Sequence, residues 1–121
     1  MTSDRPPAGR PAAGPPPEPL PLEIDPAELA GLRSAPQAYA LLDVREPWEL
    51  AICGFPEALG ELAGREHELP SDRPLIVFCH SGRRSLLAAQ YLRRLGLNEV
   101  VNLRGGVEAY ALEVDPSMAR Y

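Results

Sequence analysis

The chain has no apolar stretch long enough to cross a membrane, which takes about 18 residues or more. Its N-terminal region also lacks the apolar core of a signal peptide. Cysteine and histidine are scarce, and the spacing of Cys53, Cys79, His67 and His80 fits no zinc site. We therefore expect no membrane span, no signal peptide, no metal and no cofactor.

Positive charge is in the minority, with 12 basic against 17 acidic residues and a formal net charge of −5. The arginines are dispersed, apart from the pairs Arg83-Arg84 and Arg93-Arg94. This balance argues against nucleic acid as a partner, because nucleic-acid binding normally needs a concentrated basic surface.

The two cysteines allow one disulfide, but a different interpretation is favoured. The residues around Cys79 are typical of a reactive site, so we expect a cytoplasmic protein with a free reactive thiol. Cys53 has no comparable neighbours and is predicted to be structural. Attack by Cys53 on a modified Cys79 is the less favoured alternative.

Proline is concentrated at one end: eight of the 15 prolines lie within the first 21 residues. Such a segment cannot bury enough apolar surface to offset its ordering entropy. We expect residues 1–19 to form a disordered or polyproline-like arm, and a plain tail is favoured over a ligand for a proline-binding domain. Residues 20–121 then form one domain.

The domain alternates apolar runs with helical patterns. Alternating strands and helices predict an α/β fold whose mostly parallel sheet carries helices on both faces, in three layers. The segment 55–74 is harder to interpret, and a broken helix including Leu59, Leu62 and 67–69 is predicted there. The expected strands are 20–24 at an edge, 39–44, 75–78 and 99–103, and the expected helices are 25–34, 46 to about 54, 84–95 and 107–112. The third helix is nearly all apolar, so we expect it to be well buried.

Cys79 ends the apolar run Leu75–Phe78 and precedes the third predicted helix. A thiol at the carboxyl end of a strand then faces the N-terminus of a helix, where free N–H groups and the helix dipole favour an anion. Such a cysteine has a lowered pKa and is a nucleophile. The alternative, a small buried core cysteine, is less favoured.

The residues that follow strengthen the functional interpretation. Gly82 lets the chain curl so that amides point inward and form an anion-binding nest. Arg83 and Arg84 add positive charge, and either arginine can face the loop. His80 is predicted to be an exposed loop residue, with a general base as its alternative. The hydroxyl of Ser85 either caps the helix or points into the loop.

Asp43 and Arg45 lie two residues apart at the end of the second predicted strand, so their side chains point the same way. We favour a structural ion pair that supports the site. A contribution of Arg45 to the positive field around the thiol is the alternative.

These residues resemble the rhodanese family of single-domain sulfurtransferases. Three motifs carry the resemblance in order, namely Leu42–Glu49, Cys79–Ser85 and Asn102–Tyr110. The ending, Glu113–Pro116 with Arg120-Tyr121, is similar to that of rhodanese modules fused to enzymes that adenylate sulfur-carrier proteins.

The resemblance implies a parallel sheet between helices and a six-residue loop, Cys79 to Arg84, whose amides hold a persulfide. His80, Ser81, Gly82, Arg83, Arg84 and Ser85 are then the substrate-binding residues, and Cys79 is the catalytic one. Phosphatases of this fold have an arginine six places after the cysteine, where this chain has Ser85, so sulfur chemistry is favoured over phosphate or arsenate chemistry.

The segment 54–59 departs from the family pattern. A His-containing segment is replaced by Gly54–Ala58, and a short apolar strand of about four residues that usually follows is missing. In the family that strand lies at a sheet edge, so we expect looser structure here and unchanged chemistry.

The expected function is transfer of sulfane sulfur from thiosulfate or a persulfide donor, through a Cys79 persulfide, to a thiol or a sulfur-carrier protein. We expect the protein to act as a monomer. A non-catalytic partner-binding module of the same fold is the alternative, in which the proline-rich arm and residues 54–59 would matter most.

Overall fold

The computed structural model describes residues 21–60, 66–97 and 99–121, and within these ranges the chain forms a four-stranded sheet. The strands are β1 (Glu23–Ile24), β2 (Ala40–Asp43), β3 (Leu75–Phe78) and β4 (Val100–Leu103). They lie in the order β1-β4-β3-β2, and each neighbouring pair is parallel. The predicted α/β class and the edge position of the first strand are confirmed. The predicted arm at 1–19 lies outside the described residues.

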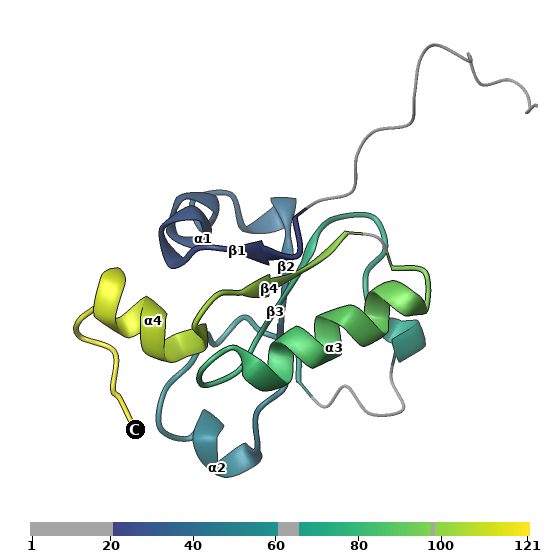
Figure 1. The fold of residues 1–121 in the computed structure, drawn as a ribbon. Coiled ribbons are helices and arrows are strands. Elements are labelled where there is room, and N and C mark those ends of the chain that lie inside the picture. The colour runs from purple at the N-terminus through teal and green to yellow at the C-terminus, as the bar shows by residue number, and fades with distance from the viewer. Residues whose placement is uncertain (1–20, 61–65, 98) are drawn as a thin grey trace, which may run out of the picture.

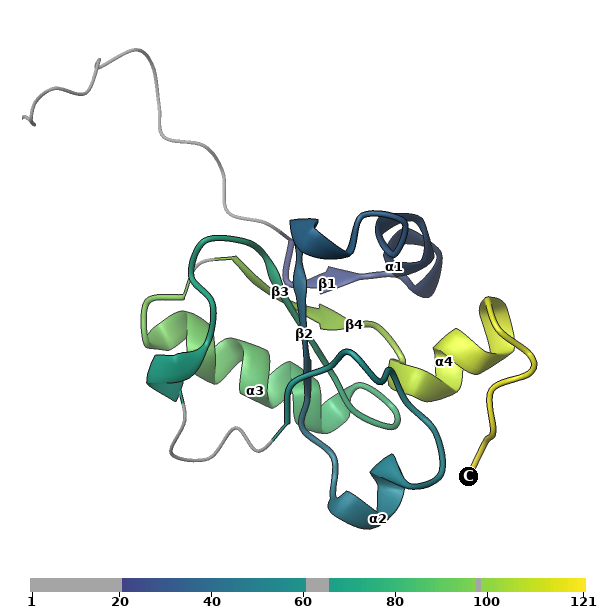
Figure 2. The same cartoon turned by 180° about the vertical axis from the view of Figure 1, so that it is seen from behind.

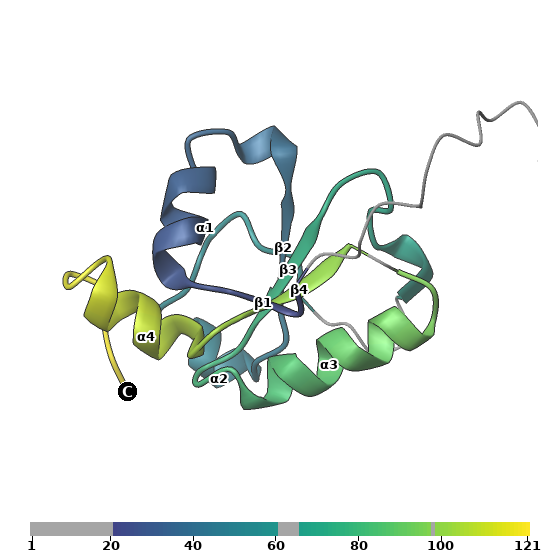
Figure 3. The same cartoon turned by 45° about the horizontal axis from the view of Figure 1, so that its top comes forward.

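Helices cover both faces of this sheet. They are α1 (Pro26–Leu32), α2 (Pro47–Leu50), α3 (Arg83–Arg94) and α4 (Gly106–Glu113), with short 3₁₀ helices at Pro36–Ala38 and Glu66–Glu68. Figures 1 and 3 show α1 and α4 on one face and α3 on the other. Figure 2 shows α2 beyond the carboxyl end of β2. The expected three layers are therefore present.

The central strand is buried on both faces, which explains its continuous apolar sequence. Ile76 and Phe78 pack into the core beneath α1 and α4, together with Leu29 and Tyr110. Leu75 and Val77 point the other way and pack into a second core beneath α3. The alternation follows from the two-residue period of a strand, and it places Cys79 at the sheet's carboxyl edge.

Two helices begin with the same local pattern. In α1 the amide of Asp25 donates to the carboxylate of Glu28, at 2.9 Å. In α2 the amide of Glu46 donates to the carboxylate of Glu49, also at 2.9 Å. A proline follows the cap in both helices. The helix α2 ends at Leu50, before the predicted end near residue 54, because the chain turns at residues 51–53.

The prediction of a broken helix that includes Leu59 and residues 67–69 is correct only in its last part, where Glu66–Glu68 forms a short 3₁₀ helix, and Leu59 is not helical. Leu59 forms a single parallel bridge with Leu42: its amide donates to the carbonyl of Leu41 at 2.9 Å, and its carbonyl accepts from the amide of Asp43 at 2.7 Å. The edge of β2 offers backbone groups that need partners, and one residue of the shortened segment supplies them. The missing edge strand is thus reduced to one bridge. Leu62 lies outside the described residues.

The prediction that the third helix is well buried is wrong for one of its two sides. Ser85, Ala89 and Leu92 are buried, whereas Leu87 is 67% exposed and Leu95 is 53% exposed. A helix that covers one face of a sheet buries only one side, whatever the composition of its other side. Among the described helices, none is long and apolar enough to cross a membrane.

Candidate active site

Cys79 follows the last residue of β3 and is fully buried. Donors from the loop converge on its Sγ. The amide of Gly82 lies 3.1 Å away, the amide of Ser85 3.4 Å and the hydroxyl of Ser85 3.3 Å. The inward-pointing amides expected from the sequence are therefore present.

The start of α4 sets the orientation of this loop. The amides of Val107 and Glu108 donate to the carbonyl oxygens of Cys79 and His80, at 2.9 and 3.0 Å. Because these carbonyls are bound on the α4 side, the amides that follow can turn toward the sulfur. The approach requires Gly106, where φ is +61° and a Cβ would collide with both carbonyl oxygens.

Ser85 lies in the first turn of α3 and is not its cap. The cap position is Gly82, whose φ of +91° suits glycine. The Ser85 hydroxyl points into the loop and also lies 2.5 Å from Oδ1 of Asn102. Since a hydroxyl carries one proton, it serves either the sulfur or Asn102 at a given moment. Of the two roles that the sequence left open, the structure shows the loop role.

Asn102 fastens the loop to the neighbouring strand β4. It is fully buried, and its Nδ2 donates to the carbonyl of Gly82 at 3.2 Å and to the carboxylate of Glu23 at 2.8 Å. Sequence reasoning gave this residue no role. A polar side chain inside the apolar run Val100–Leu103 was the available signal, because a buried amide has to find partners.

The thiol of Cys79 has a lowered pKa. Burial opposes this and is the largest single effect, since it disfavours the thiolate. The hydrogen bonds from the Ser85 hydroxyl and from the amides of Ser85, Gly82 and Ser81 together outweigh burial. The predicted direction of the shift is confirmed, and the cause lies in local N–H and O–H donors.

The two loop arginines differ. The guanidinium of Arg84 holds the carboxylate of Glu49 in α2 through two hydrogen bonds, of 2.7 and 2.8 Å. Arg83 is exposed at the surface of α3. The sequence left open which of the two arginines faces the loop. The structure places the side chain of Arg84 beside the loop, against α2.

Asp43 and Arg45 form the expected ion pair, with 2.7 Å between Oδ2 and Nη2 and both side chains buried. The same guanidinium donates to the carbonyl of Cys53 at 2.7 Å and to the hydroxyl of Tyr121 at 3.1 Å. Arg45 therefore ties the end of β2 to the loop after α2 and to the last residue of the sequence. Cys53 is a free, half-buried cysteine.

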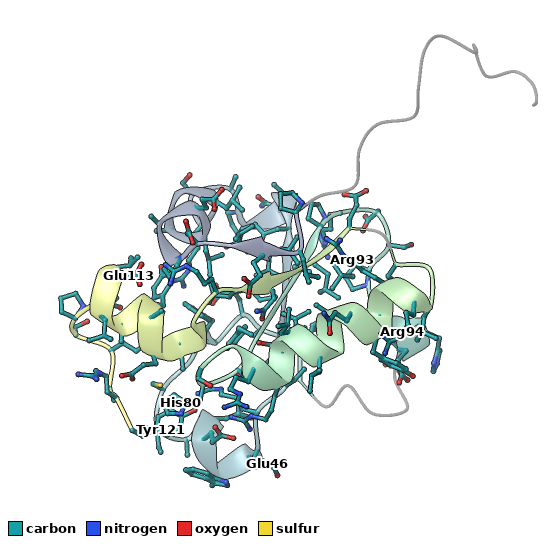
Figure 4. All side chains as sticks on the ribbon, in the orientation of Figure 1. Glu46, His80, Arg93, Arg94, Glu113 and Tyr121 are labelled. Atoms are coloured by element: carbon teal, nitrogen blue, oxygen red, sulfur yellow. The ribbon has the colours of Figure 1, made fainter. Side chains whose placement is uncertain are left out.

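His80 is not the exposed loop residue that the sequence predicted. Its ring stacks on that of Tyr121, with centroids 4.0 Å apart and planes 18° from parallel. Figure 4 shows the two side chains together at the end of the molecule where α2 lies, far from Arg93 and Arg94. The chain after α4 folds back to bring Tyr121 there, which no local pattern in the sequence signalled.

A buried thiol at the carboxyl end of a parallel strand of an α/β sheet, with converging amides and an adjacent helix N-terminus, is an arrangement that suits a cysteine nucleophile. The comparisons with known proteins identify the family. The family model described as a rhodanese-like domain matches residues 25–113. The chain belongs to the rhodanese-like family, as its three motifs predicted.

Relatives support the same conclusion. A "Sulfurtransferase" of Allochromatium vinosum is 37% identical over 101 residues, which cover 80% of this chain and 94% of that protein. The "Probable adenylyltransferase/sulfurtransferase MoeZ" of Mycobacterium tuberculosis is 33% identical over 81% of this chain, but the match covers only 26% of that protein. The crystal structure of a rhodanese-related protein from Thermoplasma volcanium has a TM-score of 0.68 and 33% identity, covering 76% of this chain and 92% of that one.

Proposed function

We propose that the protein transfers sulfane sulfur through a persulfide on Cys79. The Cys79 thiolate attacks the outer sulfur of a donor, either thiosulfate or a persulfide. The bond between the donor's two sulfurs breaks, and sulfite or a thiolate leaves with the electron pair. The products are the leaving group and a Cys79 persulfide anion, so that charge and sulfur balance.

A second nucleophile then takes the sulfur. Attack by cyanide, by a thiol or by a sulfur-carrier protein on the terminal sulfur would return Cys79 to its thiolate form. Two separate half-reactions predict ping-pong kinetics. A protein acceptor is supported by the ending of this chain, which resembles rhodanese modules fused to enzymes that adenylate sulfur-carrier proteins, and by its likeness to part of MoeZ, a probable adenylyltransferase/sulfurtransferase.

The observation that carries the proposal is the convergence of hydrogen-bond donors on one sulfur atom. The amides of Gly82 and Ser85 and the hydroxyl of Ser85 all lie within 3.4 Å of Sγ. Fixed donors of this kind stabilise negative charge on the sulfur before and after transfer, at no cost of reorganisation. Ser81, His80, Arg83 and Arg84 surround this cradle in the proposed binding site.

Mass spectrometry of the intact protein tests the proposal. Incubation of folded protein with thiosulfate should add the mass of one sulfur atom, located on Cys79 by peptide mapping, and cyanide should remove it. Cys79→Ser should abolish both changes, whereas Cys53→Ser should leave them intact. Folded protein that gains no sulfur on Cys79 from thiosulfate, from a small-molecule persulfide or from another singly charged sulfane donor would disprove the mechanism and favour the non-catalytic binding module.

A further inference from the structure

A buried carboxylate lies directly beside the loop arginine. The side chain of Glu49 is only 3% exposed, whereas that of Arg84 is 45% exposed. The two form a bidentate ion pair at 2.7 and 2.8 Å. The arginine at the rim of the proposed substrate site therefore has its charge compensated by a group of the protein itself.

Glu49 is fixed on its other sides as well. The hydroxyl of Tyr121 donates to its Oε1 at 2.8 Å, and the amide of Glu46 donates to its Oε2 at 2.9 Å. The same Tyr121 hydroxyl accepts from Arg45 at 3.1 Å. These bonds, with the Arg84 pair foremost, lower the pKa of Glu49 to about 2, so the carboxylate is charged at neutral pH.

The position of Arg84 makes this pair relevant to the substrate. Arg84 belongs to the loop that starts at Cys79. The pKa of its guanidinium is raised foremost by the hydrogen bonds to Glu49 and, to a smaller extent, by the negative charge of the Cys79 thiolate. A donor anion that reaches Cys79 therefore experiences the charge of Arg84 together with that of Glu49. Coulomb energy scales with the charge of the donor. The neutralisation of Arg84 by Glu49 therefore weakens the attraction of a doubly charged donor to the site more than that of a singly charged donor.

We infer that Glu49 is a specificity-determining residue, which neutralises Arg84 and so favours singly charged sulfur donors over the doubly charged thiosulfate. The inference rests on the proposed sulfurtransferase activity. Glu49 acts through charge and through Arg84, without touching the reacting sulfur.

Two donors with the same chemistry and different charge provide the test. Thiosulfate carries two negative charges and releases sulfite. Methanethiosulfonate, the anion CH₃SO₂S⁻, carries one and releases methanesulfinate. Each donates its outer sulfur to the Cys79 thiolate as the bond between its two sulfurs breaks. The measured quantity is the ratio of kcat/KM for thiosulfate to kcat/KM for methanethiosulfonate, with cyanide as acceptor.

The ratio should follow the net charge of the Glu49–Arg84 pair. Glu49→Gln leaves the arginine uncompensated and should raise the ratio about fivefold, mainly through the KM for thiosulfate. The double variant Glu49→Gln with Arg84→Gln restores a net charge of zero and should return the ratio to the wild-type value. The control is Glu113→Gln. Glu113 is the last residue of α4 and pairs with Arg104, away from the loop, so its replacement should leave the ratio unchanged.

Thermal unfolding would establish that each variant is folded, and neither variant leaves the buried member of the pair charged, because Glu49 is neutral in both. A ratio that is unchanged or lower in Glu49→Gln would overturn the inference, as would a double variant that behaves like Glu49→Gln. If wild-type protein forms no Cys79 persulfide with either donor, the proposed function itself has failed. The two failures are therefore distinguishable.

Discussion

The amide of Val107, at the start of α4, donates to the carbonyl of Cys79 at 2.9 Å. This bond joins residues 28 positions apart, and it links the motif Asn102–Tyr110 to the loop that follows Cys79. It orients the peptide that follows the cysteine, so that the later amides of the loop can face the sulfur. The geometry around the Cys79 thiol therefore depends on backbone groups at the start of α4.

Gly106→Ala should damage both the fold and the site. A Cβ there would collide with the carbonyls of Cys79 and His80, in a conformation with φ of +61°. We expect a loss of at least about 2 kcal/mol in the free energy of unfolding, since the strain and the clash add. Urea denaturation measures it. Gly31→Ala is the matched control, because a Cβ at Gly31 meets no atom within 4 Å, and a similar loss in both variants would contradict the prediction.

Ser85→Ala should raise the pKa of the Cys79 thiol. Among the hydrogen bonds that lower this pKa, the one from the Ser85 hydroxyl has the largest effect. Without it, the pKa-raising effect of burial is opposed only by the backbone amides. At neutral pH less thiolate is present, so alkylation of Cys79 by iodoacetamide should slow, and its pH profile should move to higher pH. Ser117→Ala, which removes an exposed hydroxyl bound to Asp115, should leave the profile in place. An unmoved profile in Ser85→Ala would show that the backbone amides suffice.

Glu49 should make stability fall at acid pH. Its pKa is about 2 in the folded protein against 4.5 ordinarily, so the stabilisation is complete above about pH 4.5 and is lost as the pH falls toward 2. The shift corresponds to roughly 2–3 kcal/mol. Urea denaturation at a series of pH values should show a steeper decline for wild-type protein than for Glu49→Gln. Equal slopes for the two proteins would disprove the assignment, and the exposed Glu113→Gln should keep the wild-type slope.

Tyr121→Ala should increase access to the loop. The ring of Tyr121 stacks on His80 and meets Trp48 edge-on at 5.9 Å, so its removal uncovers the side of the loop. We expect Cys79 to react several-fold faster with a bulky maleimide. Tyr121→Phe keeps the ring and should react at the wild-type rate, which separates the covering role of the ring from the hydrogen bonds of the hydroxyl. If both variants behave alike, the ring is not what limits access.

Local sequence was a good guide wherever the structure depends on neighbours in the chain. Asp25 and Pro26 start α1, Leu75–Phe78 forms β3 with the predicted bounds, and Asp43 bonds to Arg45 two residues away. Capping, strand period and short-range ion pairing act within a few residues, so a pattern in the sequence is enough to detect them.

The errors arose where distant segments compete or cooperate. Leu59 looked helical, but the free edge of β2 recruited it into a bridge. The apolar residues of α3 suggested a well-buried helix, but a single sheet face accommodates one side of a helix, and Leu87 stays exposed. Neither outcome can be deduced from composition, because each depends on which surface is available nearby.

The sequence by itself determined the class of protein: a strand-end cysteine, a glycine-containing loop and a helix start lie consecutively in the chain, and their chemistry follows from that order. Only the tertiary structure decided how the site is held and charged. Asn102 from β4, Glu49 from α2 and Tyr121 from the far end of the sequence reach the loop through the parallel sheet, whose carboxyl edge gathers segments that lie far apart in the chain.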